Sequence, residues 1–112
     1  MDRPIRVVFF RLNSGREPVR EWLKNQDRVF RKTIGEDIKT LQFQWPIGMP
    51  LARKIDENLW ELRSHMSSGI ARTFFTIYDG NIVLLHGFIK KSQKTPPREL
   101  AIAKLRLTKL RL

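Results

Sequence analysis

The chain opens on a pattern of apolar positions that is typical of a β-strand. Residues 5–12 (IRVVFFRL) are rich in β-branched and aromatic side chains, and they end at a turn cluster formed by residues 13–15 (NSG). Apolar side chains fall on both faces of this segment, because neighbouring strand residues point to opposite sides. The pattern therefore predicts a first strand that lies well inside a sheet.

Two helices are predicted next, separated by a short polar break. The first begins at Pro18, a residue that the first turn of a helix tolerates, and its apolar positions then recur at helical spacing (Val19, Trp22 and Leu23). The break covers residues 25–27 and ends at Asp27, which is suited to cap the second helix. That helix has an apolar face formed by Phe30, Ile34, Ile38 and Leu41. The pair is expected to form a helical hairpin.

The second half of the chain is mainly typical of strands. Residues 45–50 (WPIGMP) cannot continue a helix, because their prolines lack backbone donors and their glycine adds freedom. Three strands are predicted after this turn, over residues 59–63, 70–78 and 82–89. The last two are joined by Asp79-Gly80-Asn81, which is a strong signal for a hairpin.

A last helix is predicted after a basic loop over residues 90–95. Thr95 is expected to be its N-cap, and its apolar positions are Leu100, Ala103 and Leu107. Leucine alternates with cations over residues 104–112. This pattern is compatible with a frayed helix, an added strand or a partly ordered tail. The whole pattern predicts one α+β domain over residues 1–112 in the order βααβββα. We expect a mainly antiparallel four-stranded sheet with the helical hairpin packed on one face.

The predicted hairpin brings polar side chains together on one face. With a three-residue loop at residues 79–81, Phe74 lies opposite His86 and Arg72 lies opposite Phe88. Cationic and aromatic side chains would then share a face, which is the composition of a surface that stacks bases and holds phosphates. A two-residue turn would instead place His86 on the face opposite Arg72.

The charge balance narrows the choice of partner. The 112 residues contain 22 Lys or Arg and 11 Asp or Glu, a formal net charge of +11. Residues 86–112 alone hold eight of these cations and a single acid, Glu99. Such a cluster is either solubilising surface or a face that binds phosphates, and its position beside a hairpin end favours the second.

Several classes of protein are excluded by composition. The absence of cysteine excludes disulfides, a thiol nucleophile and a zinc ribbon. Two histidines are too few for a histidine-based metal site. No apolar run approaches the length of a membrane-spanning helix, and Arg6 and Arg11 interrupt the short apolar run near the N-terminus, unlike a signal peptide. We expect a cytoplasmic protein that binds no membrane.

The motifs of the second half resemble those of a known family. The segment LWELR (residues 59–63), the strand motif Gly69-Ile70-Ala71-Arg72 and the stretch LLHGFIKKSQKTP (residues 84–96) resemble the phage-related HigB-like branch of the RelE/ParE toxin superfamily. The resemblance implies a RelE-like fold and a type II toxin that acts as a ribosome-dependent mRNA endoribonuclease and inhibits translation. It also implies the ribosome and mRNA as partners, and a helix-turn-helix antitoxin in a hetero-oligomer.

Two alternatives remain at this stage. The same fold supports ParE-like inhibitors that bind DNA gyrase without doing chemistry, and a basic domain of this size is also compatible with a non-catalytic RNA-binding module.

The candidate catalytic residues follow from what RNA cleavage requires. A ribose 2′-hydroxyl can attack the neighbouring phosphate, so neither a protein nucleophile nor a metal or other cofactor is needed. Arg63 and Arg72 are candidates to hold the phosphate, because guanidinium groups are planar, always charged and bidentate. The alternative is that these strand arginines pair with Glu57 or Glu61.

Proton transfer needs a group that can lose a proton, which arginine practically cannot. Lys90, Lys91 and Lys94 lie close together in sequence, so each disfavours the charged form of the others. His86 titrates nearest neutrality, although a single strand histidine is more often a hydrogen-bonded structural residue. The expected catalytic set is Arg63, Arg72, His86, Lys90 and Lys94, and the expected RNA-binding set is Arg53, Lys54, Lys91, Arg98, Lys104 and Arg106.

Overall fold

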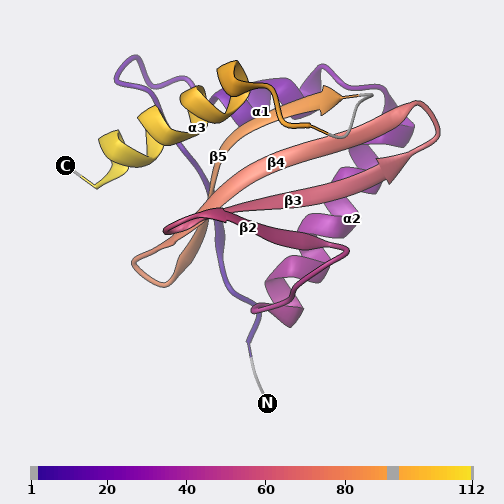
Figure 1. Ribbon diagram of the computed structural model, residues 1–112, viewed down its shortest axis with the longest axis horizontal. Helices are drawn as coiled ribbons and strands as arrows, with labels where there is room; N and C mark the ends of the chain where they lie inside the picture. The colour runs from indigo at the N-terminus through magenta and orange to yellow at the C-terminus, as the bar shows by residue number, and fades with distance from the viewer. Residues whose placement is uncertain (1–2, 91–93, 112) are drawn as a thin grey trace.

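The computed structural model describes residues 3–90 and 94–111, and these form a mixed sheet with three helices (Figure 1). The elements are β1 (Val7–Phe9), α1 (Pro18–Lys24), α2 (Arg28–Gln44), β2 (Ala52–Asp56), β3 (Leu59–Met66), β4 (Gly69–Tyr78), β5 (Asn81–Lys90) and α3 (Pro97–Leu110). The strand order is β1-β5-β4-β3-β2, with β1 parallel to β5 and the other pairs antiparallel. The α+β class is confirmed. The sheet has five strands instead of the expected four, because β2 pairs with β3.

Helices cover the two faces of the sheet unequally. The helical hairpin of α1 and α2 packs on one face, as predicted, and buries Val19, Ile34 and Leu41 against Phe75 and Leu84. The other face carries α3, whose buried Ala103 and Leu107 pack against a second apolar cluster of the sheet. Figure 1 shows α3 over the side of the sheet where β4 and β5 lie, while no helix of the described residues covers much of β2 and β3 on that face. No helix within the described ranges combines the length and the apolarity that crossing a membrane requires.

The helix signals in the sequence are confirmed where they depend on local contacts. The Asp27 side chain accepts a hydrogen bond of 2.9 Å from the backbone N–H of Phe30, so it caps α2 as expected. The apolar period then buries Ile34, Ile38 and Leu41. The segment in which leucine alternates with cations continues α3 as far as Leu110, because Leu107 packs into the core at helical spacing.

The first strand lies at an edge of the sheet, so its predicted interior position is wrong. Among the strands of residues 3–90 and 94–111, only β5 is hydrogen-bonded to it. The strand has the apolar pattern of an interior strand because both of its faces are covered, although it lies at the edge of the sheet. Val7 and Phe9 pack with the helical hairpin, while Val8 and Phe10 pack into the cluster beneath α3.

The hairpin between β4 and β5 has a tighter turn than predicted. Tyr78 pairs with Asn81, so the turn contains two residues, Asp79 (φ 52°) and Gly80 (φ 76°), both in the left-handed region that such turns require. The predicted three-residue loop is therefore wrong.

An irregularity in the same hairpin restores the expected pairing away from the turn. The register shifts between Phe74 and Phe75, where β5 contains one additional residue. Beyond this point Phe74 lies opposite His86 and Arg72 lies opposite Phe88, as predicted. Arg72 and His86 consequently share one face of the sheet, although the two-residue turn on its own would have separated them.

Candidate functional site

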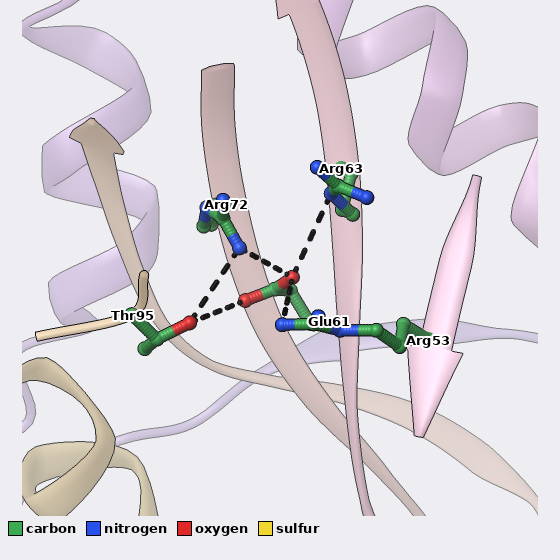
Figure 2. A network of polar contacts seen from close by, with 5 residues as sticks. All are labelled: Arg53, Glu61, Arg63, Arg72 and Thr95. Atoms are coloured by element: carbon green, nitrogen blue, oxygen red, sulfur yellow. Dashed lines mark hydrogen bonds and ion pairs between the residues drawn. The ribbon is translucent and has the colours of Figure 1, made fainter. Parts of the chain in front are cut away.

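The centre of the candidate site is a buried carboxylate surrounded by three arginines (Figure 2). Glu61 of β3 accepts a hydrogen bond of 2.9 Å from Nη1 of Arg72 on β4, and both side chains are 0% exposed. The same oxygen, Oε1, lies 3.4 Å from Nη2 of Arg53 on β2 and 3.8 Å from Nε of Arg63 on β3. Strand alternation explains the arrangement, because Glu61 and Arg63 lie two residues apart and so point to the same face.

Thr95 completes this network from outside the sheet. Its hydroxyl donates to Oε2 of Glu61 at 3.3 Å and lies 3.5 Å from Nη1 of Arg72. The prediction that Thr95 caps the last helix is wrong, because the residue at the cap position of α3 is Pro96 and no side chain of the described residues caps this end. The hydroxyl instead connects the segment before α3 to the middle of the sheet.

An open groove lies directly beside this network. It has a volume of about 610 Å³ and is lined by Arg53, Lys54, Ile55, Lys94 and Thr95. Lys54 and Lys94 are exposed, and the Arg53 side chain is 41% exposed. The groove therefore presents cationic groups to solvent, and its two sides come from β2 and from the segment that precedes α3.

The arginines expected to hold a phosphate differ in access. Arg72 is enclosed and its guanidinium is bonded to Glu61, while the Arg63 side chain is 12% exposed. The pairing of strand arginines with Glu61, which the sequence left open as an alternative, is thus present for both. Direct contact of either residue with RNA stays a prediction.

The basic segment at the end of β5 contains the candidates for proton transfer. Desolvation of its ammonium group lowers the pKa of Lys90, and the charges of Arg72 and Lys94 lower it further, while Glu61 acts in the opposite direction. Lys94 lies at the groove. Lys91, expected both to bind RNA and to take part in this cluster, lies outside the described residues.

His86 is held in a separate group beneath α3. Its ring lies roughly parallel to those of Phe74 and Phe88, with centroids 6.5 and 6.1 Å away. Its Nε2 lies 3.0 Å from Glu99 Oε1, and its Nδ1 lies 3.3 Å from Arg106 Nη1. These contacts fit a neutral ring that donates to Glu99 and accepts from Arg106. Burial lowers the pKa of His86. The carboxylate of Glu99 acts to raise this pKa, and the charge of Arg106 acts to lower it. The arrangement is that of a hydrogen-bonded structural histidine, the alternative left open by the sequence.

The cations expected on α3 have different surroundings. Arg106 donates a 2.8 Å hydrogen bond to the carbonyl of Leu85 as well as approaching His86, so it connects α3 to β5. Lys104 forms an ion pair of 3.1 Å with Asp56, and Arg98 is exposed in the first turn. The RNA-binding role of these three residues remains a prediction.

Sequence reasoning did not give Glu61 or Thr95 a place at the centre of the site. The sequence offers Glu61 only as a pairing partner for a strand arginine, and a threonine before proline is typical of a helix cap. The period-two alternation that puts Glu61 beside Arg63 was a usable signal. The contact of Thr95 joins residues 34 positions apart and had no local signal. In the described part of the chain, no three His, Asp or Glu side chains are grouped so as to hold a metal ion.

The fold and the groove define a small basic α+β protein with a cationic groove that is open to solvent. The chain belongs to the family described as Phage derived protein Gp49-like (DUF891), whose model matches residues 21–108. Members of this family are toxin-like proteins related to RelE and HigB. The resemblance to HigB-like toxins is confirmed at this level. No curated protein matches the chain.

Proposed function

We propose that the chain is the toxin of a type II toxin–antitoxin pair and that it cleaves mRNA on the ribosome, which inhibits translation. The observation that carries the proposal is the open cationic groove beside the arginines around Glu61. Membership of a toxin-like family related to RelE and HigB supports the same function. The partners in this proposal are mRNA, the ribosome and a helix-turn-helix antitoxin, and the site of action is the cytoplasm.

The proposed chemistry needs no group from outside the chain and the RNA. The ribose 2′-hydroxyl oxygen bonds to the neighbouring phosphorus and loses its proton, while the bond from phosphorus to the next 5′ oxygen breaks and that oxygen takes up a proton. Arg53 and Arg63 would stabilise the negative charge that develops on the phosphate. Lys90 and Lys94 would move the protons, and the lowered pKa of Lys90 favours such a role.

A translation reaction tests the proposal directly. Purified protein is added to a bacterial translation mixture, and the mRNA is mapped by primer extension. The wild type is expected to cut mRNA only while ribosomes translate it. Lys94→Ala is expected to lower the rate of cleavage by about 100-fold or more, the usual effect of removing a proton-transfer group. Arg53→Ala is also expected to lower the rate of cleavage, because it removes a charge that faces the phosphate.

The matched control is Lys39→Ala, which removes one exposed cation from α2 on the other face of the sheet and should cut like the wild type. Intact mRNA in a reaction whose translation has stopped would contradict the proposal. Inhibition of supercoiling by DNA gyrase without RNA cleavage would support the ParE-like alternative instead.

A further inference from the structure

In the network of Glu61, Arg72 and Thr95 (Figure 2), the Glu61–Arg72 pair lies too deep to contact a polymer, yet its contacts reach both sides of the groove. Glu61 and Arg72 have no exposed surface. Through Oε1, Glu61 contacts Arg53 on the β2 side of the groove, and through Oε2 it accepts the hydroxyl of Thr95 on the opposite side. One buried carboxylate therefore connects the two groups of residues that line the groove.

The contact of Thr95 determines where its neighbour lies. The Lys94 side chain is exposed, whereas the hydroxyl of the next residue, Thr95, is bonded to two buried side chains. A hydroxyl in this position would ordinarily cap the following helix, and here it bonds to the sheet instead. The backbone at residues 94 and 95 is thus anchored at one point, directly beside the groove.

We propose that Glu61, Arg72 and Thr95 are positioning residues that hold Lys94 across the groove from Arg53 and Lys54. This inference rests on the proposed function, in which the groove binds the RNA phosphates and Lys94 takes part in cleavage. Arg72 acts here by fixing Glu61 and Thr95, and it does not contact the RNA. Arg53 is held by the same carboxylate but remains partly exposed, so it stays accessible to a phosphate.

A double-mutant cycle between Thr95 and Lys94 tests whether one residue acts through the other. Thr95→Val keeps the shape of the side chain and removes the hydroxyl, and it is expected to lower kcat for mRNA cleavage by about 10-fold or more, because a small misplacement of a catalytic group is costly. Thr95→Ser keeps the hydroxyl and should restore the rate. In a Lys94→Ala background, Thr95→Val should cost nothing further. Additive effects, or a Thr95→Val variant as active as the wild type, would overturn the inference.

A second measurement reads the position of Lys94 without relying on cleavage. Nuclear magnetic resonance relaxation should give the Lys94 amide an order parameter near the rigid value of about 0.85 in the wild type and in Thr95→Ser, and below about 0.6 in Thr95→Val. The thermal unfolding midpoint of Thr95→Val should stay close to that of the wild type, which separates loss of position from loss of fold. An equally ordered Lys94 in Thr95→Val would overturn the positioning role. A wild type that cuts no mRNA would overturn the proposed function, while the order parameters still decide the role of Thr95.

Discussion

At the scale of single residues, the main feature is a carboxylate and a guanidinium that are both removed from water. Burying a charge is costly unless a partner compensates it, and Glu61 and Arg72 compensate each other at 2.9 Å. Such a pair contributes little net stability over an apolar pair of the same volume, but loss of one partner leaves an uncompensated charge inside the protein. The pair is therefore better understood as a means of fixing geometry than as a source of stability.

Arg72→Met is expected to lower the free energy of unfolding by about 3 kcal/mol, at the low end for a broken buried pair because Arg53 and Arg63 remain near Glu61. Urea denaturation measures this. Arg53→Met is the control: its side chain is 41% exposed, so its loss should cost under about 1 kcal/mol. The double variant Glu61→Leu with Arg72→Met should be more stable than Arg72→Met alone, and a double variant that is less stable would contradict the account.

The residues of the candidate site were predicted unevenly from the sequence. The sequence predicts Arg53 and Lys54 as RNA-binding cations and Lys94 as a proton-transfer group, and the three line one groove. Thr95 was misassigned because its sequence context, a threonine before two prolines, is also that of a helix cap. Only the long-range contact with Glu61 distinguishes the two roles, and such a contact has no signal in the local pattern.

At the scale of elements, α1 approaches the sheet most closely where Trp22 lies over Gly87 of β5. A Cβ atom added to Gly87 of β5 would collide with the ring of Trp22 on α1, so the absence of a side chain there lets the helix pack directly on the strand. The helices themselves were predictable because their period depends on neighbouring residues alone. The turn length and the edge position of β1 were not predictable, because each depends on which strands pair and on what covers both faces of the sheet.

Gly87→Ala is expected to destabilise the protein by about 1–3 kcal/mol, because the added methyl group forces α1 away from the sheet. The matched control is Gly35→Ala inside α2, where no described atom beyond the helix's own backbone lies within 4 Å of the added methyl group. This change should stabilise the protein by about 0.5–1 kcal/mol. Both changes are measured by urea denaturation. An unchanged midpoint for Gly87→Ala would mean that α1 does not depend on this contact.

At the scale of the whole molecule, the positive charge is concentrated away from the helical hairpin. Residues 17–44 contain six cations and five acids, so this side is nearly balanced, whereas residues 86–112 contain eight cations and one acid. The groove and α3 lie on the opposite face of the sheet from the hairpin. An anionic polymer should therefore approach one face of the protein in preference to the other.

The salt dependence of binding to a single-stranded oligonucleotide without 2′-hydroxyls tests this asymmetry while cleavage is prevented. Lys54→Ala should reduce the slope of log affinity against log salt concentration by about 0.7, the contribution of one phosphate contact on a single strand. Lys39→Ala changes the net charge equally but should leave the slope unchanged, because this residue lies on α2. Equal effects of the two substitutions would indicate that the charge acts diffusely.

The two edges of the sheet have a consequence for how the protein behaves in solution. The outer edge of β1 is three residues long and has arginine nearby on both sides, at Arg6 and Arg11. The outer edge of β2 carries Arg53 and Lys54 and has an irregular register before Asp56. Short, cationic and irregular edges resist the addition of further strands, which is the usual start of aggregation. The side chains proposed to bind RNA therefore also protect a sheet edge, so both requirements favour cations at the same positions.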